Sequence, residues 1–242
     1  MSSAKDHLQV FFEYQTMICN MTGMDISNAS MYDGATALAE AALMGCRLKR
    51  KTEKVIVSSA VNPGYLQVLS TYLRWADISL ETVETGDDGL TDVEDLKNKA
   101  DSAALFLFQN PNYFGLIENG ADLVQAAHKH DAFVCVSADP VSLALLKRPG
   151  DYGADIVTGE GQCLGMPMSF GGPYLGFMAT RMQYIRKMPG RIIGRTKDRN
   201  GRDCFVMTLQ AREQHIRREK ATSNICSNEA LCALTALAYL SL

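Results

Sequence analysis

Short, uninterrupted apolar runs recur along the chain, and segments with helical spacing lie between them. The runs occupy residues 54–59, 104–109, 132–137, 154–158 and 174–180, and residues 78–84 are a further expected strand. Apolar runs without polar alternation are typical of strands that are covered on both faces. Because helical segments separate them, the sequence predicts an α/β fold with a mostly parallel sheet flanked by helices. In such folds, ligands bind at the carboxyl ends of the strands.

The helical segments carry recognisable start signals. Residues with helical spacing occupy 8–22, 33–50, 62–76, 91–100 and 118–130. Asp33 precedes an alanine-rich segment and is a good N-cap, and Asn62 followed by proline is a good helix entry. Thr91, with Glu94 three residues later, predicts a capping box.

The C-terminal part of the chain has a different pattern. Residues 188–210 are basic and rich in turn formers, and DRNG at 198–201 predicts a hairpin. Residues 211–242 predict a helix, a break and a second helix that extends to the chain end without a cap. We therefore expect a further domain to be missing after this helix.

Composition argues against several classes of protein. The net charge of −3 gives no basic excess for a nucleic-acid partner. No uncharged apolar run approaches the roughly 18 residues that a membrane span needs, and the N-terminus lacks the apolar core of a signal peptide. The seven cysteines include no CxxC pair, and the four histidines are scattered. We therefore expect reduced thiols in a cytoplasmic protein and no metal site.

A glycine-rich loop follows the apolar run that ends at residue 158. Loops of this kind hold the reactive side chain in many α/β enzymes. Between Asp155 and Arg181, however, the ionisable residues are only Glu160, Cys163 and Tyr174. The loop therefore lacks the lysine or histidine that such a site usually needs.

Several polar segments each allow two interpretations. The turn and helix start at 32–42 is either an anion site or a capped helix with small residues for packing. Asn110, Asn112 and Tyr113 either hydrogen-bond a substrate or form a turn with Asx bonds to its own backbone. Asp139 either pairs with a ring nitrogen or a ribose, or caps a helix.

The segment 212–224 is dense in charge and leads into an apolar stripe with small residues. A charge-dense helix is usually a solvated face. A basic helix that leads into such a stripe is also suited to contact a partner subunit.

Five motifs together resemble one known family. They are MYDGATALAEAA, FQNPNYFG, SFGGPYLGFMATR, MPGRIIGRTKDRNG and TLQAREQHIRREKATSNIC. They resemble the first half of the glycine-cleavage-system P-protein, from about residue 12 onward. The resemblance implies the fold-type I architecture of pyridoxal-phosphate enzymes. It also implies that residues 1–242 form a single large domain that lacks the family's N-terminal segment and C-terminal small domain.

The resemblance offers an explanation for the missing lysine. In the second half of the family's enzyme, a His-Lys pair follows the corresponding strand, and the lysine holds pyridoxal phosphate. Gly161 and Gln162 would take the positions of that pair, and an amide cannot form an imine. Ala138 would take the position of the aspartate that pairs with the ring nitrogen, with Asp139 one residue further on. The resemblance thus implies no catalytic residue here and a cofactor held by the partner subunit.

The same resemblance implies the remaining site residues. The backbone of Gly171 and Gly172 would approach the partner's cofactor phosphate. A degenerate pocket would be lined by Asn110, Asn112, Tyr113 and Gln162, and a subunit interface by Arg212, His215, Arg217, Arg218 and Asn224.

The implied activity is that of glycine dehydrogenase (decarboxylating), assembled as a heterotetramer. Its implied partners are the lysine-bearing subunit, the lipoylated H-protein, which receives the aminomethyl group, and the substrate glycine. Two alternatives stay open at this point. One is a stand-alone pyridoxal-phosphate transferase or lyase with a displaced lysine, and the other is a catalytically silent scaffold subunit.

Overall fold

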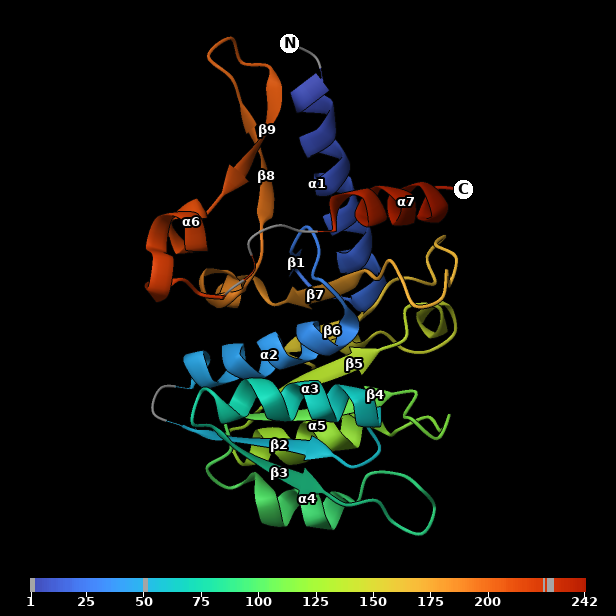
Figure 1. Ribbon diagram of the computed structural model, residues 1–242. Helices are drawn as coiled ribbons and strands as arrows, with labels where there is room; N and C mark the ends of the chain where they lie inside the picture. Colours follow the sequence, from blue (N-terminus) through green and yellow to red (C-terminus); the bar gives the residue numbers. More distant parts are fainter. Residues whose placement is uncertain (1–2, 50–51, 224, 226–228) are drawn as a thin grey trace.

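The computed structural model describes residues 3–49, 52–223, 225 and 229–242. Within these residues seven strands form one sheet, in the order β1-β7-β6-β5-β4-β2-β3 (Figure 1). The strands that pair in parallel are β2 (Lys54–Ser58), β3 (Ser79–Val83), β4 (Leu105–Asn110), β5 (Phe133–Ala138) and β6 (Ile156–Glu160). Two strands are antiparallel to their neighbours: β7 (Gly176–Thr180) and β1 (Ile26–Ser27). The predicted mostly parallel sheet is therefore confirmed.

Helices cover both faces of the sheet. The six longer helices are α1 (Ser3–Thr22), α2 (Gly34–Leu48), α3 (Pro63–Arg74), α4 (Val93–Ala100), α5 (Gly120–Lys129) and α7 (Ala230–Leu240). Leu105 and Leu107 of β4 pack with α2 and α3 on one face. Phe106 and Phe108 pack with α1, α4, α5 and α7 on the other. This two-sided burial explains why the strands are apolar at successive positions.

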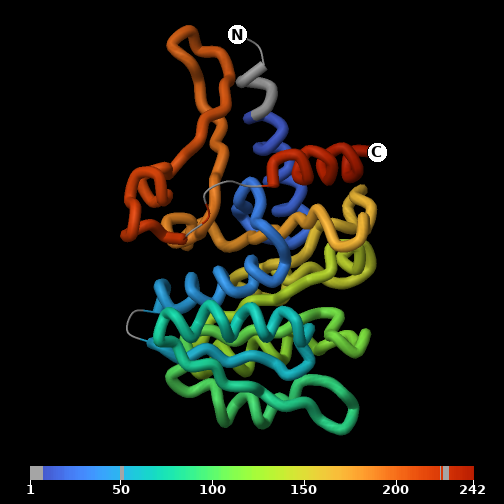
Figure 2. The backbone as a smooth tube through the Cα atoms, viewed as in Figure 1, coloured from blue at the N-terminus to red at the C-terminus, as the bar shows by residue number. Residues whose placement is uncertain are grey.

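A two-stranded hairpin rises beside α1, away from the sheet (Figure 2). It consists of β8 (Ile192–Lys197) and β9 (Asp203–Thr208), joined by the predicted turn at 198–201. Phe205 of the hairpin packs against Phe12 of α1, with ring centroids 5.2 Å apart. The Gln15 amide accepts from the Ile193 N–H at 2.9 Å and donates to the Ile193 carbonyl at 3.1 Å. The hairpin is therefore fixed to α1 by apolar and polar contacts.

The N-cap of α4 differs from the prediction. Its N-cap is Asp92, whose carboxylate accepts from the N–H groups of Glu94 at 2.8 Å and Asp95 at 3.2 Å. Thr91 is instead buried, and its hydroxyl lies 2.7 Å from that of Ser58. Sequence spacing alone did not distinguish the two adjacent polar residues.

The helix expected at the start of the segment 211–242 is also wrong in its extent. The structure has a four-residue helix, α6 (Gln214–Arg217), between single 3₁₀ turns. Leu209 and Arg218 have φ values of 53° and 51°. A right-handed helix does not continue through such residues. Leu209 directly precedes the first 3₁₀ turn, and Arg218 is the C-cap of α6.

No helix in the described ranges is both long enough and apolar enough to cross a membrane.

Candidate functional site

A cavity of about 470 Å³ lies where β4, β5 and β6 end. The side chains that define it include Asn62, Tyr65, Gln109, Asp139, Glu160 and Gln162. A smaller hollow of about 280 Å³ adjoins it and reaches the first residues of α2. The cavity thus occupies the edge at which parallel α/β sheets bind their ligands.

Glu160, at the end of β6, connects three separate parts of this edge. Its Oε2 accepts from the Gly34 N–H, at the start of α2, at 2.9 Å. Its Oε1 accepts from the N–H groups of Gln162 at 3.0 Å and Leu175 at 2.8 Å. One carboxylate therefore binds a helix start and both ends of the loop 161–175.

Gly34 permits this close approach. A Cβ atom at this position would lie 2.5 Å from the Tyr65 hydroxyl and 3.1 Å from Cβ of Glu160. Burial, and next the negative charge of Glu160, raise the pKa of Tyr65, so its hydroxyl stays protonated. The site thus combines a carboxylate and a neutral phenol at the start of α2.

Carboxylates belonging to the chain surround the N-terminus of α2. Asp33 is its N-cap and accepts from the Thr36 N–H at 2.7 Å, as the capped-helix interpretation predicted. The Glu160 carboxylate accepts a hydrogen bond from the Gly34 N–H. A helix N-terminus attracts anions through its free N–H groups and the helix dipole. Here the protein itself supplies the negative charge.

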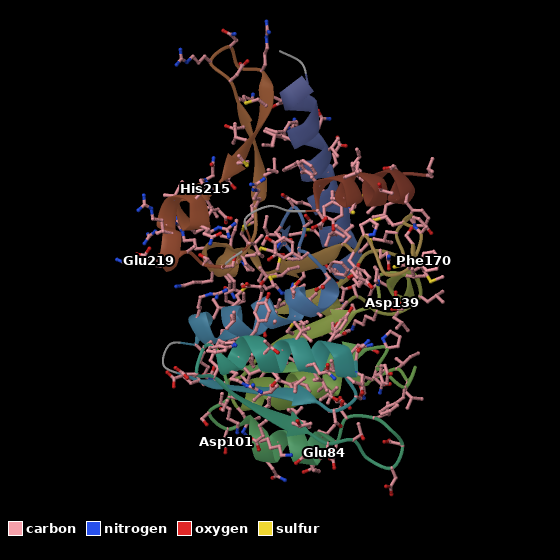
Figure 3. The ribbon with its side chains drawn as sticks, in the orientation of Figure 1. Glu84, Asp101, Asp139, Phe170, His215 and Glu219 are labelled. Carbon is pink, nitrogen blue, oxygen red and sulfur yellow. The ribbon has the colours of Figure 1, made fainter. Side chains whose placement is uncertain are left out.

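The loop 161–175 is anchored at its ends and exposed at its tip. Leu164 and Leu175 belong to the apolar core beneath α1 and α7. Phe170, at the tip, is fully exposed and lies on the same flank of the molecule as Asp139 (Figure 3). Gln162 is among the residues that line the cavity, and its side-chain amide lies 3.4 Å from the Pro167 carbonyl. A ligand contact for Gln162 stays a prediction.

The N–H groups of Gly171 and Gly172 already have an acceptor. Both donate to the Met168 carbonyl, at 2.9 and 3.2 Å. An external anion would have to replace that carbonyl. Their predicted contact with a partner's cofactor phosphate stays a prediction.

Asp139 lies just past β5, at the wall of the cavity. Its Oδ1 accepts from the Val141 N–H at 2.8 Å, and its carbonyl accepts from the Ser142 hydroxyl at 2.7 Å. The carboxylate therefore stabilises the turn that follows β5 while one side of the residue faces the cavity.

Asn112 forms an internal network away from the cavity. Its Oδ1 accepts from the N–H groups of Phe114 and Leu116, at 3.0 and 3.1 Å. Its Nδ2 donates to the buried Glu118 carboxylate at 2.9 Å. These bonds are the Asx turn of the second interpretation.

The two other residues of that turn lie close by. The Asn110 Oδ1 accepts from the Glu118 N–H at 3.1 Å, and Tyr113 is 54% exposed. Neither residue, nor Asn112, is among those that line the 470 Å³ cavity. A ligand contact for the three stays a prediction.

The predicted interface residues lie on another flank, marked by His215 and Glu219 in Figure 3. Arg212 points inward, with hydrogen bonds to the carbonyls of Met188 and Gly190. Three others are exposed, namely His215, Arg217 and Arg218. Asn224 lies outside the described residues. Whether these residues contact a partner stays a prediction.

The sheet order and its two helical layers define the fold of the large domain of fold-type I pyridoxal-phosphate enzymes. Among solved structures with this fold, a cysteine desulfurase from Thermococcus onnurineus NA1 aligns with a TM-score of 0.62 at 17% identity. The alignment covers 96% of this chain and 56% of that one. At this identity, the likeness shows the fold alone.

The family follows from closer matches. The family model described as "Glycine cleavage system P-protein" matches residues 3–242, and the chain belongs to this family. A crystal structure of glycine decarboxylase (P-protein), in inhibitor-bound form, aligns with a TM-score of 0.93 at 46% identity, over 98% of this chain and 53% of that one.

Curated relatives agree with this membership. Two proteins named "Probable glycine dehydrogenase (decarboxylating) subunit 1", from Desulforamulus reducens and Moorella thermoacetica, are each 56% identical over 236 residues. Each match covers 97% of this chain and 52% of the relative. The chain therefore spans about half the length of the curated relatives it matches.

The fold family implies pyridoxal phosphate, but the residues of the cavity do not fit it. Of the described residues, those that line the cavity or the adjoining hollow include neither lysine nor arginine. The Gly34 N–H, which a phosphate would need, donates to Glu160. Gln162, next to the end of β6, cannot form an imine. Among the described residues, the lining of this cavity therefore offers no amine for the aldehyde, and the Gly34 and Thr36 N–H groups at the start of α2 already donate to carboxylates.

Proposed function

We propose that the chain is the cofactor-free part of a glycine-decarboxylating P-protein. A lysine-bearing partner subunit would hold pyridoxal phosphate, which supplies the electron sink for loss of carbon dioxide from glycine. The observation that carries this proposal is the position of Glu160, whose carboxylate accepts the Gly34 N–H at the start of α2. A phosphate group in that position would meet a negative charge instead of a free donor.

The proposed assembly follows the names of the relatives. "Subunit 1" in those names supports a second subunit, and we propose a heterotetramer in the cytoplasm. Its substrate would be glycine, and the aminomethyl group would pass to the lipoyl arm of the H-protein. Residues 1–242 would form one large domain of the first subunit.

The exposed loop tip is the part of this chain that we propose to contact the partner's active site. Met168 and Phe170 are 82% and fully exposed, and they flank the turn that leads to Gly171. Apolar side chains so exposed on a loop favour contact with another chain. In the complex the tip would exclude water from the partner's cofactor, and the Gly171 and Gly172 N–H groups would turn to its phosphate.

The charged segment gives a second proposed contact. His215, Arg217 and Arg218 are exposed, and none of the three lies within 4.0 Å of an acidic side chain in the part of the chain that the structure describes. Gln162 would line this chain's own, degenerate pocket, with Asn110, Asn112 and Tyr113 in the neighbouring turn.

Reconstitution with the lysine-bearing subunit tests the proposal. We expect glycine-dependent release of carbon dioxide from the complex with H-protein, and none from either subunit alone. In the complex, Gly171→Trp should raise the concentration of pyridoxal phosphate needed for half-maximal activity at least fivefold. Activity of the isolated chain would support a stand-alone enzyme instead.

Gly201→Trp is the matched control. Gly171 and Gly201 both have positive φ, 115° and 76°, and both lie in exposed turns where a Cβ meets little or nothing. Backbone strain is therefore similar in the two variants. Equal activity of the Gly171 variant, the Gly201 variant and the wild type would show that the chain is only a scaffold.

A further inference from the structure

A second cavity, of about 390 Å³, lies on the flank that carries α6, away from the exposed loop tip (Figures 1 and 3). No acidic residue is among the described residues that line it. Its cationic residues are Arg47, Arg186, Lys187, Arg212, Arg217 and Lys220. Arg47 belongs to the last turn of α2, whose first residue binds Glu160. With 15 residues α2 is about 22 Å long, so the two cavities are separate.

The cations at the bottom of this basic cavity are only partly compensated. Nε and Nη2 of Arg47 and Nε of Arg212 are buried and have no hydrogen-bond partner among the described residues. Burial lowers the pKa of both guanidinium groups, and the charge of Arg212 further lowers the pKa of Arg47. Because these three atoms have almost no exposed surface, an entering anion would not contact them directly. It would instead offset the two guanidinium charges through space, from the cavity that Arg47 and Arg212 line.

The nearest carboxylates do not neutralise the cavity. Glu213 lies 3.2 Å from Arg212 and compensates that one group. Glu40 approaches Arg47 only to 4.0 Å, and its Oε2 has no hydrogen-bond partner among the described residues. Burial raises the pKa of Glu40 to about 7, so at neutral pH it carries only part of a negative charge.

The rim and walls add the features of a small-molecule site. Arg186, Lys187, Arg217 and Lys220 are exposed at the rim, where they would attract anions from solution. The walls also contain apolar Leu209, Ala211 and Ala221, and the Thr222 side chain. The volume lies within the range of small-molecule pockets, roughly 300–1,000 Å³.

We propose that the basic cavity is a binding site for a phosphate monoester. Guanidinium groups bind phosphate oxygens through paired hydrogen bonds, and the apolar wall would contact the organic part of the ester. The ester is either a free small molecule or a phosphate group carried by a partner chain, since the same residues would bind both. The site is independent of where the decarboxylating cofactor is held.

Calorimetric titration of the purified chain, at constant ionic strength, tests the proposal. The probes are inorganic phosphate and glycerol 3-phosphate, with glycerol and acetate as controls. We expect saturable binding of both phosphates with a Kd below about 1 mM, and at least tenfold weaker binding of acetate. Equal binding of acetate, or no saturation by 10 mM phosphate, would overturn the proposal.

Variants assign the binding to this cavity. Arg186→Gln and Lys220→Gln alter exposed side chains and should each weaken phosphate binding about fivefold or more. Arg47→Met should abolish it. Arg199→Gln removes the same charge from the exposed hairpin turn, outside the cavity, and should leave the Kd unchanged. Equal effects of Arg199→Gln and Arg186→Gln would reduce the binding to general charge attraction and refute the site.

A second titration, with the lysine-bearing subunit present, distinguishes the two sources and rests on the proposed function. Retained binding of glycerol 3-phosphate supports a free ester as the ligand. Loss of binding to the complex, with binding to the isolated chain intact, supports a phosphate group of the partner. Failure of the subunits to associate would count against the proposed function but would leave the first titration and its outcome intact.

Discussion

Replacing Glu160 by alanine should destabilise the chain by about 3 kcal/mol. The carboxylate accepts three backbone N–H groups, those of Gly34, Gln162 and Leu175, at 2.8–3.0 Å. A hydrogen bond to a charged group contributes roughly 1.5–3 kcal/mol when it is buried. Glu160 is partly exposed, so water replaces part of each bond, and we take about 1 kcal/mol for each.

Glu160→Gln should cost less, about 1 kcal/mol. One amide oxygen can still accept from the loop, whereas the amide NH₂ would face the Gly34 N–H, which is also a donor. The free energy of unfolding should therefore decrease from the wild type to the glutamine variant and again to the alanine variant.

Urea unfolding followed by far-ultraviolet circular dichroism measures these differences. Tryptophan emission is a poor probe, because the one tryptophan, Trp75, is 86% exposed in the folded chain. Glu84→Ala, at an exposed glutamate in Figure 3, is the matched control and should change stability by less than about 0.5 kcal/mol. If Glu160→Ala also costs less than 0.5 kcal/mol, the carboxylate does not hold the loop to α2.

Three further perturbations test other parts of the structure. Burial raises the pKa of Glu40 from 4.5 to about 7, so the wild type should lose about 3 kcal/mol of stability between pH 4.5 and a pH above 7. Glu40→Gln has no carboxyl group to ionise there and should not show this loss. If urea unfolding gives the same stability difference between the two proteins at both pH values, the prediction is wrong. Gly159→Ala places a Cβ against the Ala138 carbonyl and the Phe177 ring and should cost about 3 kcal/mol, and unchanged stability would show that the strands can separate. A hydrogen bond to Asp155, 2.8 Å away, raises the pKa of His128. This pair therefore stabilises the fold below pH 6.5, and its contribution is lost as the pH rises. His128→Gln should reduce the free energy of unfolding more at pH 5 than at pH 9, and the reverse order would contradict the assignment.

Local pattern was sufficient to predict most of the architecture. The apolar run at 104–109 forms a strand with both faces buried. Leu105 and Leu107 belong to the core on one face of the sheet, and Phe106 and Phe108 belong to the core on the other. Each position therefore needs an apolar side chain, and no polar residue interrupts the run. The capping signal at Asp33 was equally local and was confirmed. The hairpin turn at 198–201 was predicted for the same reason.

The candidate site could be predicted only in part, because its key contacts join distant residues. In the sequence, Glu160 stands out as the one carboxylate beside the glycine-rich loop. Gly34 stands out as the first residue after the N-cap of a predicted helix. Their hydrogen bond spans 126 positions, so no local pattern indicates it. The basic cavity likewise joins Arg47 to residues 186–222, and the backbone beside it has positive φ values at Leu209 and Arg218, which local pattern did not predict.

The central claim is that this chain does not itself hold the decarboxylating cofactor. Its most direct test is mass spectrometry after borohydride reduction of the complex with pyridoxal phosphate, followed by separation of the subunits. We predict one pyridoxyl group on a lysine of the partner and less than about a tenth of an equivalent on this chain. A stoichiometric pyridoxyl group on any lysine of this chain would contradict the account.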